Sequence, residues 1–151
     1  MTTRRFSLDS NVLVYAADGR AGPRHARALQ ILVLAARQDC VLTLQALGEF
    51  FHAATRKRIV LRHEAAAQIR DLLTIFATVA ADAGAFRAAL ESSAQGKHSL
   101  WDGLLVATVA RAGCAFLLSE DMQDGARFCG VTILDPFVGE ELPEPVAALL
   151  R

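Results

Sequence analysis

The sequence predicts an α/β protein with three layers, α/β/α, built on a central parallel sheet. Two observations predict this fold class. Short apolar runs alternate along the whole chain with longer segments of helical periodicity, which is typical of a parallel sheet covered on both faces. The segment 99–111 is apolar on almost every face of its expected helix, and such a helix is a buried one. With 151 residues, 53% of them hydrophobic, we expect residues 1–151 to form a single domain.

Short apolar or β-branched runs bounded by polar residues mark the strands. The first run leads directly to Asp9, and the clearest run, 114–118, begins just after the helix-terminating Gly113. In chain order, the expected strands are residues 6–8, 40–43, 77–81, 114–118 and 131–134.

Apolar side chains at helical spacing mark the helices. In the second helix Ala28, Ile31 and Ala35 lie on one face, and Pro23 suits the first turn. Basic residues are favourable at the C-terminus of the third, where Arg56-Lys57-Arg58 stands. In chain order, the helices are expected at 11–17, 24–37, 44–57, 63–76, 83–94 and 99–111, and the tail from about Phe137 has room for one short helix.

The composition excludes several classes of protein. No uncharged apolar stretch approaches the ~20 residues that a membrane span needs, and Asp9 interrupts the apolar segment that follows the N-terminal arginines. We therefore expect a cytoplasmic protein without a membrane-spanning segment. Cys40, Cys114 and Cys129 are odd in number and far apart, so we expect reduced, buried side chains and no disulfide or metal site.

The net charge of zero, from 16 basic and 16 acidic residues, hides an asymmetry. If the five acids named below share one pocket, the remaining surface is basic by about five charges. Almost all of the bases are arginine, whose planar fork suits phosphate. Zero net charge therefore does not exclude a nucleic-acid partner.

Several acidic side chains are expected at one edge of the sheet. Asp9 ends the first strand, and Asp121 and Asp124 follow the strand 114–118. Asp102 opens the buried helix, and Glu49 lies in the helix after the second strand. Because the carboxyl ends of parallel strands face the same way, and ligands bind there in open α/β sheets, these acids predict a functional site.

Each acid also has a purely structural explanation. Asp9 or Ser10 can cap the helix that follows, and Ser99-x-x-Asp102 resembles a capping box. Ser119 is a plausible cap for the segment after it. Glu49-x-x-His52 resembles half of a di-iron site, but such sites need the motif twice and the chain has it once. No functional role is expected for the four histidines, His25, His52, His63 and His98.

Several carboxylates in one cleft repel each other and raise each other's pKa values unless a cation neutralises them. No cysteine or histidine pair has the spacing of zinc ligands. All-oxygen ligands suit Mg²⁺ or Mn²⁺, which are typically held by a few carboxylates and substrate phosphates. An acidic metal pocket on an arginine-rich surface indicates phosphodiester chemistry.

Four segments carry a resemblance to a known family. They are Phe6-Ser7-Leu8-Asp9-Ser10-Asn11, Leu47-Gly48-Glu49-Phe50, Leu100-Trp101-Asp102-Gly103-Leu104-Leu105-Val106-Ala107 and Leu117-Leu118-Ser119-Glu120-Asp121-Met122-Gln123-Asp124-Gly125. In this order and spacing, the chain resembles the PIN-domain ribonucleases, most closely the VapC-type toxins of bacterial toxin–antitoxin pairs. The resemblance covers about residues 5–137.

The resemblance implies a metal-dependent endoribonuclease that leaves 5′-phosphate and 3′-hydroxyl ends. Its acidic site maps onto Asp9, Glu49, Asp102 and Asp121, of which Asp9, Asp102 and Asp121 would hold Mg²⁺ or Mn²⁺ and Glu49 would orient or deprotonate the attacking water. The remaining assignments are Asp124 as a less certain member, Asn11 and Ser119 as supporting residues, and Arg56, Lys57 and Arg58 either as RNA-backbone contacts or as a solvated helix end. A homodimer and a cognate antitoxin are also implied.

Three rival functions were weighed against this one. A haloacid-dehalogenase-type, Mg-dependent phosphatase needs a second acid two residues after the first, where Asn11 stands. A phosphoacceptor receiver domain needs an acidic pair before the aspartate strand and a late lysine, and the chain has neither. The non-enzyme alternative is a catalytically silent PIN-like domain that binds RNA or a partner. The intact set of acids argues against it.

Overall fold

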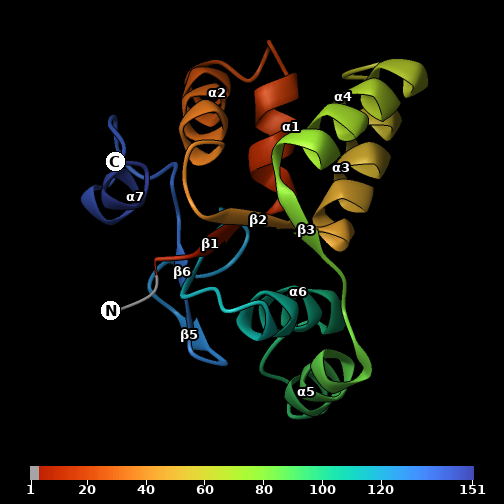
Figure 1. Ribbon diagram of the computed structural model, residues 1–151, viewed down its shortest axis with the longest axis vertical. Coiled ribbons are helices and arrows are strands. Elements are labelled where there is room, and N and C mark those ends of the chain that lie inside the picture. The colour runs from red at the N-terminus through yellow and green to blue at the C-terminus, as the bar shows by residue number, and fades with distance from the viewer. Residues whose placement is uncertain (1–3) are drawn as a thin grey trace.

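The computed structural model describes residues 4–151, which fold around a six-stranded sheet of order β3-β2-β1-β4-β6-β5 (Figure 1). All neighbouring strands are parallel except β5 and β6. In chain order, the strands are β1 (Phe6–Leu8), β2 (Cys40–Thr43), β3 (Ala77–Val79), β4 (Phe116–Leu118), β5 (Arg127–Phe128) and β6 (Val131–Leu134).

Helices cover both faces of the sheet, so the predicted three-layer α/β/α fold is confirmed. Figure 1 shows α1 to α4 on one face and α5 and α6 on the other, with α7 beside α2. Within residues 4–151, no helix combines the length and apolarity that crossing a membrane requires. The helices are α1 (Ser10–Ala17), α2 (Pro23–Ala35), α3 (Leu44–Arg56), α4 (Arg62–Ile75), α5 (Ala83–Ala94), α6 (Leu100–Arg111) and α7 (Glu144–Leu149).

Strand β1 lies in the middle of the sheet and brings distant parts of the chain together. Ser7 pairs with Val41 of β2 and with Leu117 of β4, and every β1 residue is buried. The β1–β4 ladder continues for one residue, because the Asp9 amide donates to the Leu118 carbonyl at 2.9 Å. This bond places Asp9 beside Ser119 at the carboxyl edge of the sheet.

The prediction that segment 99–111 is a buried helix is confirmed. Ser99 caps α6, and all residues from Gly103 to Val109 are buried between the sheet and α5. A Cβ at Gly103 would lie 3.5 Å from the Ala89 backbone, in ordinary van der Waals contact, so α5 and α6 pack closely at this point. This packing fixes the N-terminus of α6, which carries Asp102.

The expected helices and the five expected strands are present, with boundaries that differ by up to two residues. The sequence analysis missed β5, which has only two residues. Its hairpin with β6 turns at Cys129 and Gly130, both with positive φ (52° and 79°). Such tight turns are usually signalled by Asn-Gly or Asp-Gly, so Cys-Gly gave no signal.

The expectation for the cysteines was right for two of the three. Cys40 and Cys114 are buried and all three are free, but Cys129 is exposed. The prediction that Cys129 is buried was therefore wrong, because this residue occupies the tip of the unpredicted hairpin.

Candidate functional site at the carboxyl edge of the sheet

Asp9 is buried at the end of β1, with 4% of its surface exposed. Its Oδ1 accepts a hydrogen bond from the Ser10 amide at 2.7 Å and so caps α1. Its Oδ2 accepts from the Ser119 hydroxyl at 2.7 Å. The residue is thus a helix cap and, at the same time, part of a polar network that reaches the end of β4.

The Ser119 hydroxyl is fully buried and makes three hydrogen bonds. Besides donating to Asp9, it accepts from Asn11 Nδ2 at 3.3 Å and from the Asp121 amide at 3.1 Å. Asn11 Oδ1 in turn accepts from the Glu120 amide at 3.4 Å. Ser119 and Asn11 therefore hold the loop that carries Asp121 against the start of α1. Ser119 caps no helix, because a turn and not a helix follows β4.

Glu49 is half-buried on α3 and is oriented through both of its oxygens. Oε2 accepts from the Ser10 hydroxyl at 3.2 Å, and Oε1 accepts from Gln45 Nε2 at 2.9 Å. The same Gln45 amide also donates to the Trp101 carbonyl at 2.9 Å. Gln45 thereby connects Glu49 to the first turn of α6, next to Asp102.

Asp102 and Asp121 line the same cavity, which has a volume of about 300 Å³. Asp102 is half-buried, and its amide donates to the Ser99 hydroxyl at 3.1 Å, as the capping alternative predicted. Asp121 is exposed at the cavity. The two carboxylates come from α6 and from the loop after β4, which are far apart in the sequence.

Burial raises the pKa of Asp9 to about 6. The hydrogen bonds from Ser119 and Ser10 act in the opposite direction, and the negative charges of Glu49 and Asp121 raise the pKa further. Within residues 4–151, Asp9 takes part in no ion pair. The site therefore holds a buried acid whose negative charge no protein cation compensates.

The donor set fits a divalent cation in its chemistry. The acids offer only oxygen ligands. A cation among them would neutralise the negative charge of Asp9, which has no positively charged partner in the described part of the protein. As placed, no three His, Cys, Asp or Glu side chains of the described part converge closely enough to ligate one ion. The network instead joins Asp9 to Glu49 through Ser10, and it joins these two acids to the backbone at Asp121 and Trp101 through Ser119 and Gln45.

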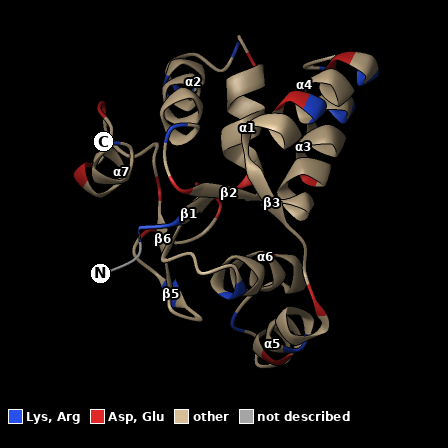
Figure 2. Ribbon diagram, in the orientation of Figure 1, with Lys and Arg blue, Asp and Glu red and all other residues tan. Residues whose placement is uncertain are grey.

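Asp124 and the basic cluster lie apart from this network. Asp124 is exposed, and its Oδ1 accepts from the Asp135 amide at 2.9 Å, a contact that fixes the loop. Arg56, Lys57 and Arg58 are exposed at the outer end of the α3–α4 hairpin (Figure 2). Helix α3 has 13 residues, so this end lies roughly 20 Å along the helix from β2.

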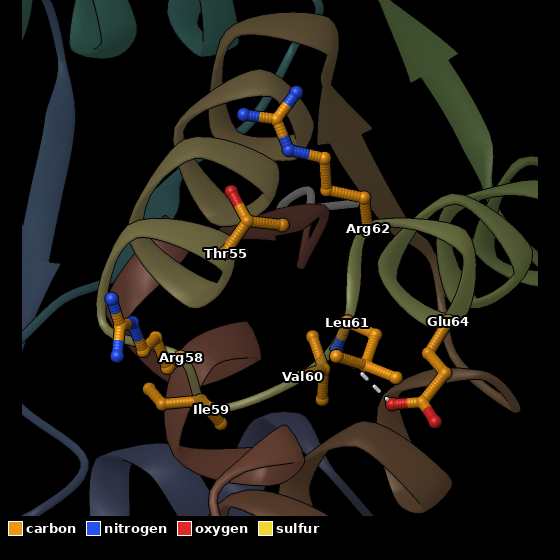
Figure 3. A pocket seen from close by; sticks show the side chains of 7 residues that line it. All are labelled: Thr55, Arg58, Ile59, Val60, Leu61, Arg62 and Glu64. Atoms are coloured by element: carbon orange, nitrogen blue, oxygen red, sulfur yellow. Dashed lines mark hydrogen bonds between the residues drawn. The ribbon is translucent and has the colours of Figure 1, made fainter.

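A second hollow, of about 340 Å³, lies at the α3–α4 turn. Figure 3 shows Arg58 and Arg62 on either side of Thr55 there, and Glu64 accepting from the Leu61 amide. Arg58 has a φ of 56°, a conformation that non-glycine residues adopt rarely. The hollow is lined by none of the four predicted acids.

The sequence analysis missed several polar residues of the site. Gln45 precedes Glu49 by one helical turn, so the i, i+4 spacing could have revealed it. His98, which was assigned no role, lines the cavity of Asp102 and Asp121, as do Lys97, Arg127 and Phe128. Two of these residues lie on β5 and could not be placed without that strand.

Residues 7–124 match the family model described as the PIN domain. The chain belongs to the PIN-domain family. Nucleases of this family generally use divalent metal ions. No curated protein sequence matches the chain.

Solved structures of other PIN-domain proteins have the same fold. The VapC20 toxin of Mycobacterium tuberculosis, which cleaves the sarcin–ricin loop, has 19% identity and a TM-score of 0.64, with 77% of this chain and 91% of that chain covered. A toxin–antitoxin complex from Klebsiella pneumoniae has 19% identity and a TM-score of 0.64, over 87% and 97%. VapBC2 of Rickettsia felis, bound to promoter DNA, has 13% identity and a TM-score of 0.60, over 85% and 96%.

Proposed function

We propose that this PIN domain is a metal-dependent endoribonuclease and the toxin of a type II toxin–antitoxin pair. The observation that carries the proposal is the buried, unpaired Asp9, connected through Ser119 and Ser10 to the elements that bear Asp121 and Glu49. The helix cap needs only a hydrogen-bond acceptor, which a neutral asparagine also supplies, whereas a nuclease needs the negative charge to hold a cation. The similarity to toxin–antitoxin structures supports the cellular role.

In this proposal Asp9, Asp102 and Asp121 hold Mg²⁺ or Mn²⁺, and Asp124, which lies apart from them, supports the site by fixing the loop after β4. A metal bound there would lower the pKa of a water molecule and stabilise charge on the phosphate. Glu49 orients that water and accepts its proton, and the bonds from Gln45 and Ser10 keep the carboxylate in place. Water attacks phosphorus in line, the bond between phosphorus and the 3′ oxygen breaks, and the leaving oxygen takes a proton from solvent, so that the products carry 5′-phosphate and 3′-hydroxyl ends.

The partners follow from the same proposal. The substrate is RNA, contacted along its backbone by arginines, with Arg56, Lys57 and Arg58 as candidates. The protein acts in the cytoplasm as a homodimer, and a cognate antitoxin blocks the acidic cleft. The relatives described as VapBC or toxin–antitoxin complexes support the antitoxin partner.

The test is cleavage of RNA with and without a chelator. We expect cleavage to stop in excess EDTA and to return when Mg²⁺ or Mn²⁺ is added beyond the chelator, because the clustered acids need a cation. The Asp9→Asn variant serves as the inactive control for contaminating nucleases. Undiminished cleavage in EDTA would rule out the acidic site as the catalytic centre.

A further inference from the structure

The cavity that contains Asp102 and Asp121 is lined by residues of different chemistry. Besides the two acids, its lining includes Lys97 and His98, from the loop between α5 and α6, and Arg127 and Phe128, from β5. Ligand pockets in proteins start at ~300 Å³, so a cavity of about 300 Å³ has room for a group of about the size of one nucleotide.

Two aromatic rings belong to the lining of this cavity. His98 and Phe128 have centroids 4.5 Å apart with planes inclined by 38°. The Nδ1 atom of His98 lies 2.6 Å from the Ser92 hydroxyl, and Ser92 is buried in α5, so the imidazole is held in place. At this separation the two rings stack on each other, so one face of each is covered, and a base can stack only on the outer face of one of them.

Two cations accompany the rings. Lys97 and Arg127 are exposed, and within residues 4–151 neither takes part in an ion pair. They lie on the same cavity as two carboxylates and yet do not pair with them. Cations that remain unpaired beside an aromatic ring suit the phosphates of a single-stranded nucleic acid.

We propose that this cavity binds the nucleotide next to the scissile phosphate. Its base stacks on the outer face of Phe128, which His98 supports from the other face, its outer phosphate contacts Lys97 and Arg127, and the scissile phosphate lies at Asp102 and Asp121. The inference rests on the proposed function and adds the substrate-binding residues to it. RNA must be unpaired at this position, because a base inside a duplex cannot reach the rings.

The test combines cleavage kinetics on a single-stranded oligoribonucleotide with variants of the cavity. We expect Phe128→Ala to raise KM about 10-fold or more, the range that loss of one stacked base produces, with kcat within twofold. Phe128→Trp should restore the wild-type KM. The matched control Phe86→Ala removes an exposed aromatic ring from α5 and should leave KM unchanged.

The cations are tested by salt dependence. The double variant Lys97→Ala with Arg127→Ala should reduce the slope of log KM against log salt by about two, one for each phosphate contact. The double variant Arg70→Ala with Arg87→Ala removes two exposed arginines from α4 and α5 and should leave the slope unchanged. Thermal unfolding of every variant identifies effects that come from loss of folding.

A measurement without cleavage separates this inference from the proposed function. Titration with adenosine 5′-monophosphate should shift the NMR amide signals of His98 and Phe128. If the wild type cuts RNA but Phe128→Ala keeps its KM and these signals do not move, the inference fails and the nuclease proposal stands. If the wild type cuts no RNA and the signals do move, only the nuclease proposal fails. An effect of Phe128→Ala confined to antitoxin binding would assign the cavity to a protein and overturn the inference.

Discussion

Asp9 and Asp82 have the same sequence signal and opposite environments. Each follows a strand and caps a helix: Asp9 accepts from the Ser10 amide, and Asp82 accepts from the Ala85 amide at 2.8 Å. Asp82 is exposed and forms an ion pair with Arg111 at 2.8 Å, and these contacts lower its pKa. Asp9 is buried beside two other acids, and its pKa is raised to about 6.

The difference teaches how to distinguish a structural cap from a functional acid. A cap is favourable in itself, and a nearby cation makes it more so. An acid that is buried among acids is unfavourable for the fold, and it persists where a ligand compensates for it. Asp9 can therefore have both roles at once. Its Oδ1 caps the helix, and its Oδ2 is the oxygen that the functional site uses.

The largest expected effect is on RNA cleavage, which should depend on Asp9 and not on Asp82. Asp9→Asn should reduce RNA cleavage by a factor of roughly 100 or more, because a neutral amide binds a cation weakly. Asparagine still caps a helix and removes a buried charge, so the melting temperature without metal should hold or rise. Cleavage assays and metal-free thermal unfolding measure the two effects.

The control for that experiment is Asp82→Asn, which should leave cleavage unchanged. Equal cleavage by Asp9→Asn and the wild type would reduce Asp9 to a helix cap like Asp82.

The second prediction concerns the pH dependence of stability without metal. The folded pKa of Asp9, about 6, lies above its unfolded value of 3.8, so between these pH values the folded state binds more protons. The stabilising contribution of the protonated Asp9 carboxyl is fully present below pH 3.8 and is lost as pH rises through 6. The free energy of unfolding should therefore fall by roughly 3 kcal/mol over this range.

Urea unfolding at pH values from 4 to 7 measures this fall, as the difference between the wild type and Asp9→Asn. Asp82 has a lowered pKa, so its contribution is lost only as pH falls, below the range of the test. A difference that is flat with pH would contradict the raised pKa of Asp9.

A third prediction removes the hydroxyl that connects Asp9 to the Asp121 loop. Ser119→Ala deletes a buried group with three hydrogen bonds and leaves Asp9 Oδ2 without its donor. We expect a loss of about 2 kcal/mol in the free energy of unfolding and about 10-fold slower cleavage. Ser119→Cys is similar in size and has a weaker donor, so its stability and cleavage rate should lie between those of the wild type and Ser119→Ala. Cleavage by Ser119→Ala at the wild-type rate would show that the bond to Asp9 does not position the site.

The smallest expected effect belongs to Asp82. Asp82→Ala removes a cap and an exposed ion pair, and such pairs contribute little. The melting temperature should fall slightly, by less than in Ser119→Ala, while cleavage stays at the wild-type rate. If Asp82→Ala lost as much cleavage as Asp9→Asn, Asp82 would not be a purely structural cap, and the contrast with Asp9 would be wrong.

The sequence could predict the fold because its signals are local. Strand and helix periodicities alternate without ambiguity, and parallel strands then bring Asp9 and Asp121 to one edge by geometry alone. The hydrogen bonds of the site could not be predicted, because Ser119 meets Asp9 across two strands and Gln45 meets the Trp101 carbonyl between two helices. The β5–β6 hairpin was not predicted, because its turn sequence is unusual. For this reason Arg127 and Phe128 were assigned no role, and Cys129 was wrongly placed in the interior.

The bond between Asp9 and Ser119 joins residues 110 positions apart. Strand β1 is synthesised before its partner β4, which follows after more than a hundred further residues. At ~5–20 residues per second, a ribosome needs roughly 5 to 20 seconds to cover that distance. The nascent chain therefore carries Asp9 without its partner for at least that time, and the acidic edge is completed only after β4 has been synthesised.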